Sequence, residues 1–140
     1  MTDAAIITCD QFISHPPEEV WKALTEPELL ARWWAPGDIR PVVGHRFTLD
    51  MGQWGKQPCE VTEVEVHKMI SYRFADGSLD TKITWRLVPE GTGTRLFLAH
   101  EGFDLDSPMG RQAYDGMGAG WPNVLSRIDG VLRASGIASR

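Results

Sequence analysis

Residues 107–135, SPMGRQAYDGMGAGWPNVLSRIDGVLRAS, form the longest stretch of the chain with a helical pattern. Ser107 suits the N-cap, and Pro108 suits the first helical position, where a missing N–H costs no hydrogen bond. Apolar residues then recur at steps of three and four, which places them on one helical face. The members of this face are Met117, Trp121, Val124, Leu125, Ile128, Val131 and Leu132. The stretch predicts a long amphipathic C-terminal helix.

Two features interrupt this helical pattern. Gly116, Gly118 and Gly120 each weaken the middle of the helix by up to ~1 kcal/mol relative to alanine. Pro122 lacks an amide donor, so we expect the helix to kink or restart there. Gly136 is a natural stop. An amphipathic helix needs an apolar partner, and the rest of the chain is patterned to supply one.

The composition is typical of a soluble globular protein: 140 residues, 42% of them hydrophobic and 24% charged. This length predicts one domain over residues 1–140. The net charge of −5, without a run of basic residues, argues against partners such as nucleic acid or anionic membranes. No stretch approaches the ~20 apolar residues of a membrane span. The N-terminal residues do not resemble a signal peptide, so we expect a cytoplasmic protein with reduced cysteines.

The first third of the chain predicts one strand and two short helices. Residues 5–14 are rich in β-branched residues and alternate loosely, as a strand does. A first helix begins near Pro17, where Glu18 and Glu19 suit the positive end of the helix dipole. A second short helix begins near Pro27 and ends at Pro36.

From residue 41 onward the hydrophobic period is two, which is the period of a strand. A bulge near Thr62 accounts for a break in the alternation. The predicted strands cover residues 43–51, 58–67, 70–74, 81–88 and 94–103. Short turns between them predict antiparallel pairing with one apolar face. The long helix would cover this face, and the two short helices would close one end, in an α+β fold.

Three segments resemble a known family. They are ISHPPEEVWKALTEPELLARWWAP at residues 13–36, TRLFLAHEGF at 94–103 and GWPNVLSRIDGVL at 120–132. Together they resemble the activator of heat-shock-protein-ninety ATPase homologue-like family, within the START-like (SRPBCC) superfamily. The resemblance implies the helix-grip fold of the birch-pollen allergen: a curved six-stranded antiparallel sheet gripping a long C-terminal helix, with a cavity between them. Lipid carriers, polyketide cyclases and co-chaperones share this fold, so the resemblance implies no single reaction.

A cavity in this position would be lined by the inward-facing side chains of the sheet and the helix. The candidate ligand-binding residues are Phe47, Met51, Tyr72, Phe74, Ile83, Trp85, Leu98, His100, Met117, Trp121 and Leu125. Candidate entrance residues are Trp33, Trp34 and Trp54. Plain core packing explains the same residue types. The helix-grip arrangement predicts that Met117 and Trp121 lie opposite Trp85 and His100.

His100 and Tyr72 are the candidate catalytic residues. His100 alternates with Leu96 and Leu98, so its imidazole points inward and could orient a ligand or act as an acid or base. Tyr72 could offer its hydroxyl in the same way. The alternative for both is a structural hydrogen bond. The histidines and cysteines show no metal-ligand spacing, and no nucleophile or phosphate-loop motif occurs, so we predict no metal and no cofactor.

We therefore favour a non-enzymatic binder of a small hydrophobic molecule, such as a lipid, a polyketide or an aromatic metabolite. One alternative is a cyclase or hydrolase that uses His100 and Tyr72 as acid and base. Another, implied by the resemblance alone, is a module that interacts with a chaperone in the stress response. A homodimer formed through an edge strand or through Trp54 is a further possibility.

Overall fold

The computed structural model describes residues 5–135, which form a six-stranded antiparallel sheet in the order β1-β6-β5-β4-β3-β2 together with its covering helices. Gly136, the expected helix stop, lies outside the described residues. The elements in chain order are β1 (Ala5–Ile13), α1 (Pro17–Thr25), α2 (Pro27–Trp33), β2 (Arg46–Asp50), the short 3₁₀ helix η1 (Gly52–Trp54), β3 (Lys56–Glu65), β4 (Met69–Phe74), β5 (Thr81–Glu90), β6 (Gly93–Phe103), α3 (Pro108–Leu125) and α4 (Ile128–Ala134).

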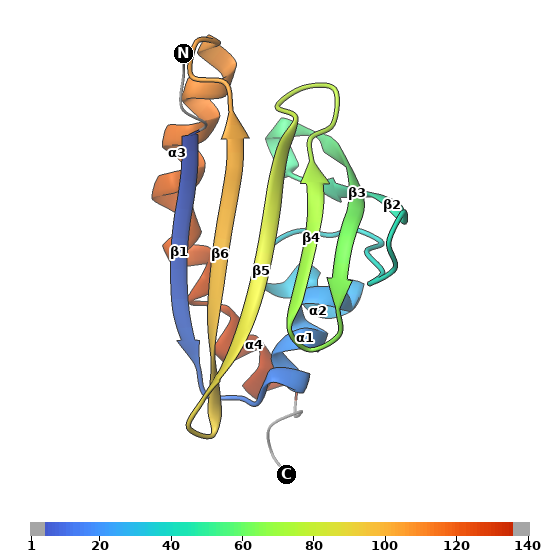
Figure 1. Cartoon of the computed structure of the whole chain (residues 1–140), viewed down its shortest axis with the longest axis vertical. Coiled ribbons are helices and arrows are strands. Elements are labelled where there is room, and N and C mark those ends of the chain that lie inside the picture. The colour runs from blue at the N-terminus through green and yellow to red at the C-terminus, as the bar shows by residue number, and fades with distance from the viewer. Residues whose placement is uncertain (1–4, 136–140) are drawn as a thin grey trace.

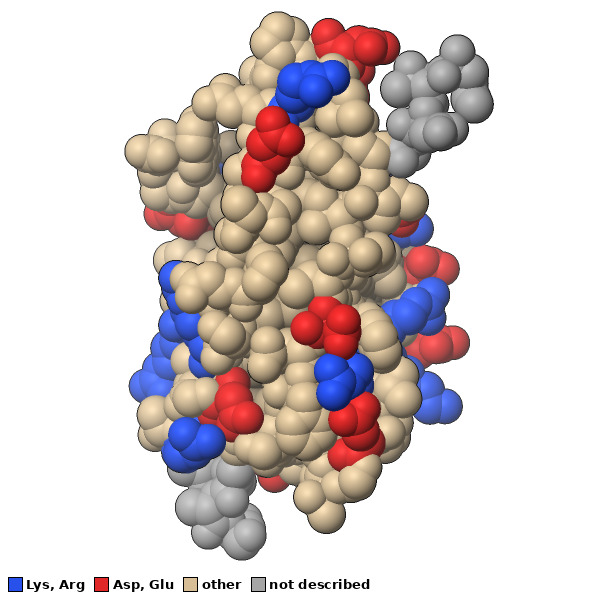
Figure 2. All heavy atoms as spheres, turned by 90° about the vertical axis from the view of Figure 1, so that its left-hand side faces the viewer, with Lys and Arg blue, Asp and Glu red and all other residues tan. Residues whose placement is uncertain are grey.

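The helices divide into two groups (Figure 1). The long helix α3 runs beside β1 and β6, while α1, α2 and α4 gather at one end of the sheet. Figure 2 shows the side formed by β1 and α3, where charged side chains are sparse and much of the centre carries none. This arrangement confirms the predicted helix-grip fold with its two short helices after the first strand.

The face of the sheet that the helices cover is built in rows across neighbouring strands. In one row Tyr72 of β4 pairs with Ile83 of β5, which pairs with His100 of β6. All three side chains are fully buried. In the next row Trp85 of β5 pairs with Leu98 of β6. Because successive residues of a strand face opposite sides, this alternation was readable from the sequence.

The C-terminal helix begins as predicted and breaks later than predicted. The hydroxyl of Ser107 accepts a hydrogen bond from the amide of Gly110 at 3.3 Å, which makes it the N-cap. The helix continues through Pro122, and the restart comes at residues 126–127. Proline removes one hydrogen bond, but Trp121 and Leu125 on this turn are buried, and their packing holds the helix together.

The second strand is shorter than predicted. It begins at Arg46, whereas the hydrophobic pattern suggested residue 43. Gly44 adopts a φ of 90°, and the amide of His45 donates to the carbonyl of Val42 at 3.0 Å, so this segment is a turn. The exposed side chain of Val42 belongs to that turn. The bulge predicted near Thr62 is confirmed by a register shift between Val61 and Glu63.

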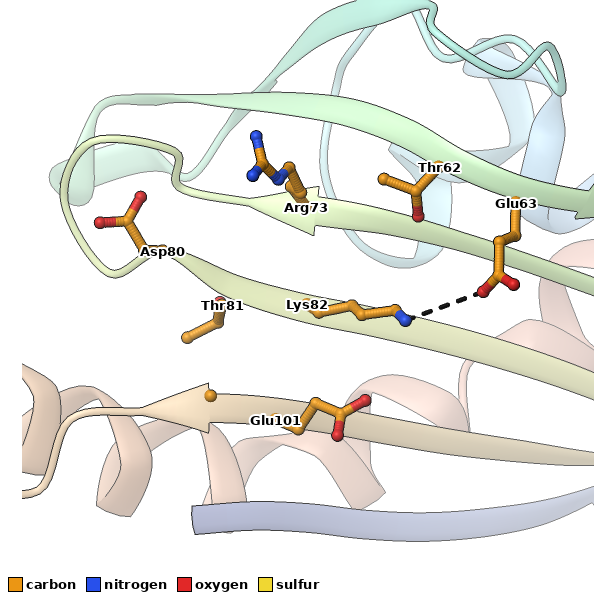
Figure 3. A pocket seen from close by; sticks show the side chains of 8 residues that line it. Thr62, Glu63, Arg73, Asp80, Thr81, Lys82 and Glu101 are labelled. Carbon is orange, nitrogen blue, oxygen red and sulfur yellow. Dashed lines mark ion pairs between the residues drawn. The ribbon is translucent and has the colours of Figure 1, made fainter. Parts of the chain in front are cut away.

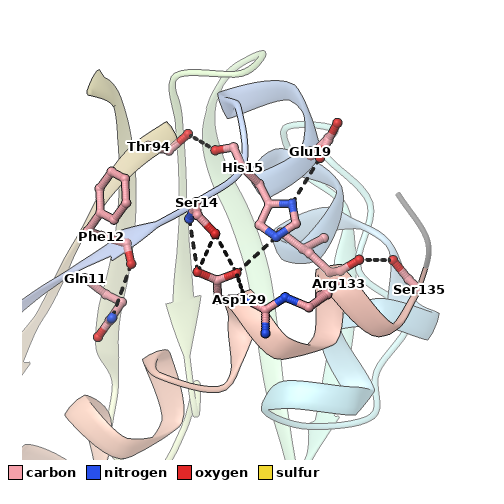
Figure 4. A network of polar contacts seen from close by, with 10 residues as sticks. Gln11, Phe12, Ser14, His15, Glu19, Thr94, Asp129, Arg133 and Ser135 are labelled. Atoms are coloured by element: carbon pink, nitrogen blue, oxygen red, sulfur yellow. Dashed lines mark hydrogen bonds and ion pairs between the residues drawn. The ribbon is translucent and has the colours of Figure 1, made fainter. Parts of the chain in front are cut away.

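A buried histidine fixes α4 to the start of α1 (Figure 4). Nδ1 of His15 lies 3.2 Å from a carboxylate oxygen of Glu19, and Nε2 lies 3.1 Å from a carboxylate oxygen of Asp129. The amide and hydroxyl of Ser14 also donate to Asp129. Partial burial alone would raise the pKa of Asp129, but the hydrogen bonds that its carboxylate accepts outweigh this effect and hold the pKa below its ordinary value.

Removing this histidine should destabilise the fold strongly. His15→Ala leaves Glu19 and Asp129 facing each other across an emptied, buried position, with an expected loss of about 2–3 kcal/mol in the free energy of unfolding. Urea titration followed by circular dichroism measures this loss. The matched control is Arg46→Ala, which breaks an exposed ion pair with Glu60 and should cost no more than ~0.5 kcal/mol. Equal losses in the two variants would contradict this account of His15.

Candidate functional site

An aromatic cluster joins the sheet to the helices that cover it. The cluster consists of Trp33 and Trp34 at the end of α2, Trp85 on β5 and Trp121 on α3. The ring centroids of Trp33 and Trp85 are 5.6 Å apart, those of Trp85 and Trp121 also 5.6 Å, and those of Trp34 and Trp121 5.0 Å. Offset and edge-to-face contacts at such distances stabilise aromatic pairs. The cluster lies in the region where the sequence predicted a cavity, between the sheet and the covering helix.

The other predicted ligand-binding residues face the same interior or its margin. Met51 and Met117 are half-buried, and Met51 lies just beyond the end of β2. The remaining sheet and helix members are buried, namely Phe47, Tyr72, Phe74, Ile83, Leu98, His100 and Leu125. Burial of this kind fits both a packed core and the wall of a ligand site.

The predicted entrance residues have three different environments. Trp33 is fully buried, and its indole N–H donates to the carbonyl of Ala23 at 2.8 Å, so it belongs to the core and not to an entrance. Trp34 is half-buried and contacts Phe74 as well as the rest of the aromatic cluster. Trp54 is 63% exposed on η1. Trp33 is the last residue of α2, whereas Trp34 is its C-cap and has a non-helical φ of −133° and ψ of −79°.

Trp121 of α3 makes the predicted contacts with Trp85 and His100 of the sheet. Its indole N–H donates to Nδ1 of His100 at 3.1 Å, and its ring packs edge-on against Trp85. Met117, one turn earlier on α3, packs against the hydrophobic core from a half-buried position. Trp121 thus touches both predicted partners, Trp85 and His100.

His100 belongs to a chain of hydrogen bonds with a fixed direction. Trp121 donates to Nδ1, so the proton of the neutral ring resides on Nε2. Nε2 lies 2.9 Å from the hydroxyl of Thr81, and that hydroxyl donates to the carbonyl of Phe74 at 3.2 Å. Every acceptor and donor of the imidazole is therefore used inside the protein.

Burial keeps the imidazole of His100 neutral. It lowers the pKa of His100 from 6.5 to about 3. The rings of Phe74, Phe103 and Trp121 surround it, and none of them offers a charge. A neutral imidazole with both nitrogens engaged is typical of a structural histidine.

Tyr72 belongs to a separate contact. Its hydroxyl oxygen accepts a hydrogen bond from the indole N–H of Trp85 at 2.9 Å. Burial raises the pKa of Tyr72 above its ordinary value, so the phenol stays protonated. His100 and Tyr72 lie two strands apart in one row, and their hydrogen bonds go to different tryptophans. The described contacts therefore do not join them as an acid–base pair.

Two surface hollows lie away from the aromatic cluster. The larger, of about 380 Å³, is on the outer face of the sheet and is lined by Thr62, Glu63, Arg73, Asp80, Thr81, Lys82, Glu101 and Gly102 (Figure 3). Lys82 forms an ion pair with Glu63 there at 3.7 Å. The smaller, of about 290 Å³, includes Phe47 and Cys59. Each hollow combines acidic with basic side chains, and acidic ones are in the majority in both.

The described residues offer no arrangement for a metal ion: within positions 5–135, no three His, Cys, Asp or Glu side chains gather around a common point. Over the same positions, no helix combines the length and the apolar character that crossing a membrane requires. Cys9 and Cys59 are both free thiols.

The sequence did not identify Thr81 as the partner of His100, although a signal was present. Thr81 lies two residues before Ile83 and four before Trp85 on the same strand, so the strand alternation predicts that its hydroxyl faces the interior as they do. Its hydrogen bond to His100 depends on the packing of β5 against β6, which a pattern along one strand does not specify. The contacts of His15 with Glu19 and Asp129 were not predicted for a similar reason, because Asp129 lies 114 positions away in the sequence.

Comparison with known proteins agrees with this fold. The family profile described as Activator of Hsp90 ATPase homolog 1-like protein matches residues 14–133. Protein MLL2253 from Mesorhizobium loti is 36% identical, with a TM-score of 0.81 over 93% of this chain and 98% of that chain. CalU16 from Micromonospora echinospora is 27% identical, with a TM-score of 0.74 over 92% of this chain and 76% of that chain.

A third solved structure shares the fold at lower identity. The Aha1 dimer from Colwellia psychrerythraea is 20% identical, with a TM-score of 0.75 over 91% of this chain and 96% of that chain. A comparison with curated proteins found no match. The profile covers most of the chain, and MLL2253 resembles it over nearly its full length. The chain therefore belongs to the family of Activator of Hsp90 ATPase homolog 1-like proteins.

Proposed function

We propose that the protein binds a small hydrophobic molecule between the sheet and α3, without transforming it. The observation that supports this most directly is the aromatic cluster of Trp33, Trp34, Trp85 and Trp121, which draws rings from the sheet, α2 and α3 into one place. Flat apolar molecules stack favourably on such rings. A family fold built around a sheet and one covering helix agrees with binding there.

Access to this interior would pass Trp34. This ring is the half-buried member of the cluster and contacts Phe74, Trp85 and Trp121. A ligand that packs against this ring would shield it from solvent and meet the sheet and α3 together. On α3, a Cβ built at Gly116 or Gly120 would meet no atom within 4 Å, whereas one at Gly118 would lie 3.8 Å from Ile7, so the helix packs on β1 through Gly118.

The enzymatic alternative gains no support from the geometry. An acid or base must reach the reacting proton within a hydrogen-bond distance. Both nitrogens of His100 are engaged by Trp121 and Thr81, and the imidazole stays neutral. Binding to a chaperone, dimerisation of the chain and a role for Trp54 at an entrance stay predictions. No contact among the described residues favours any of the three.

Tryptophan accessibility tests the binding proposal. In a Trp54→Phe variant, Trp34 is the partly exposed indole, because Trp21, Trp33, Trp85 and Trp121 are each no more than 6% exposed. Acrylamide quenching of this variant should fall on addition of a bound naphthalene derivative, fatty acid or aromatic polyketide. We expect the accessible fraction of the fluorescence to fall by about half or more for a saturating ligand.

The control is the double variant Trp34→Phe with Trp54→Phe, whose remaining indoles are buried. Its quenching should not change when the same compounds are added. Absence of protection in the single variant across the whole panel would overturn the proposal. Native mass spectrometry of the purified protein supplies an independent measurement, since a co-purified molecule appears as a mass shift.

A further inference from the structure

Tyr72 is a fully buried side chain with a polar group that a ligand could use. It lies on β4, is fully buried and faces the helices. The ring of Phe47 packs edge-on against it at 5.3 Å, and Trp85 lies within hydrogen-bond distance. Trp85 also touches Trp34 and Trp121, so the hydroxyl of Tyr72 lies beside the aromatic cluster.

The hydroxyl of Tyr72 has an unused hydrogen. An indole nitrogen only donates, so in the bond between Trp85 and Tyr72 the hydroxyl oxygen is the acceptor. Among the described residues, no acceptor takes the hydrogen of this hydroxyl. Three other buried donors are occupied: Trp33 donates to Ala23, Trp121 to His100, and Thr81 to Phe74. A fully buried donor without an acceptor favours a ligand that brings one.

The same interior has no charge with which to bind an ion. The fully buried polar side chains among residues 5–135 are threonines, one serine and two histidines. Of the histidines, His15 is already engaged by Glu19 and Asp129, and His100 is neutral. Moving a carboxylate or an ammonium group into such surroundings costs several kcal/mol.

We propose that the ligand is an uncharged aromatic molecule that carries a hydrogen-bond acceptor, such as a ketone or ester carbonyl, and that the hydroxyl of Tyr72 donates to it. This inference rests on the proposed function, because it assigns the chemistry of a molecule bound between the sheet and α3. The oxygen of Tyr72 keeps its bond from Trp85 while its hydrogen serves the ligand, so binding adds a hydrogen bond without breaking one. Donation by Trp85 also makes the hydroxyl a stronger donor.

Three naphthalenes of similar size test this inference by isothermal titration calorimetry at neutral pH. They are 2-acetylnaphthalene, which is neutral and has an acceptor, 2-ethylnaphthalene, which has none, and 2-naphthoate, which is an anion. We expect the wild-type protein to bind the acetyl compound about fivefold more tightly than the ethyl compound. The naphthoate should bind about tenfold more weakly than the acetyl compound, or worse.

Tyr72→Phe should abolish the preference for the acetyl compound while leaving the affinity for the ethyl compound nearly unchanged. The matched control is Tyr114→Phe, because the chain has two tyrosines and Tyr114 packs on Phe103, outside the aromatic cluster. This control should keep the fivefold preference. The comparison of the three ligands on the wild-type protein needs no variant, so it decides the question even if Tyr72→Phe folds poorly.

The outcomes separate the two proposals. Equal binding of the acetyl and ethyl compounds, tighter binding of the naphthoate, or a preference that survives in Tyr72→Phe each overturns the role of Tyr72 while the binding function stands. Absence of binding by all three compounds, together with no protection of Trp34, overturns the binding function itself.

Discussion

Replacing Trp121 with alanine should reduce the free energy of unfolding by about 3–5 kcal/mol, which is the usual cost of truncating a buried tryptophan. Trp121 is 2% exposed and packs against Trp34, Trp85 and His100. Its loss removes the contact through which α3 meets the middle of the sheet. It also leaves Nδ1 of His100 without its donor. Urea unfolding followed by circular dichroism gives the number without relying on tryptophan fluorescence.

Two further variants divide this loss into its parts. Trp121→Phe keeps a ring against Trp85 but removes the N–H that His100 accepts, so it should cost about 1–3 kcal/mol, the penalty for an unsatisfied buried acceptor plus some packing. Trp54→Ala removes a tryptophan that is 63% exposed and should stay within ~0.5 kcal/mol of the wild type. If Trp121→Ala were no more harmful than Trp54→Ala, the packing of α3 on the sheet described above would be refuted.

The alanine variant also bears on ligand binding. It leaves a space lined by Trp34, Trp85 and His100 that has the size of an indole ring. Added indole should fill this space and raise the urea midpoint of Trp121→Ala, because a ligand that binds only the folded state stabilises it. The wild-type midpoint should rise less under the same conditions. Equal responses of the two proteins would show that indole binds elsewhere.

The fold could be predicted because its signals are local. The parity of residues such as Ile83, Trp85 and Leu98 assigned the inner face, and steps of three and four assigned the covering face of α3. The errors lie where local chemistry and packing compete. Pro122 is a helix breaker by its chemistry, but the buried Trp121 and Leu125 keep the helix continuous.

The candidate site was only partly predictable. The sequence placed Tyr72 and His100 inward, but it did not show which atoms of these residues are already satisfied. That depends on Trp85 and Trp121, which reach them from the next row and from another element. The consequence is an exchange of roles: His100, the stronger catalytic candidate by sequence, is fully engaged, and Tyr72 retains the unused donor.

The stability of the protein should fall as the pH falls from 6.5 toward 3, through His100. Burial lowers the pKa of His100 from 6.5 to about 3. Within this window the unfolded chain binds a proton at His100 and the folded protein does not, so acid favours unfolding. The stabilisation is fully present above pH 6.5. Between pH 6.5 and 4.5 we expect it to decrease by about 2 kcal/mol, at ~1.4 kcal/mol for each pH unit.

His100→Gln isolates this contribution. An amide can still donate to Thr81 and accept from Trp121, but it does not titrate. The variant should be less stable than the wild type at pH 7, and the difference between the two proteins should shrink by about 2 kcal/mol on going to pH 4.5. The other three histidines are the same in both proteins, so the comparison isolates position 100. Parallel urea-midpoint curves over this range would mean that His100 becomes protonated without unfolding, which an imidazole enclosed by Phe74, Phe103 and Trp121 does not permit.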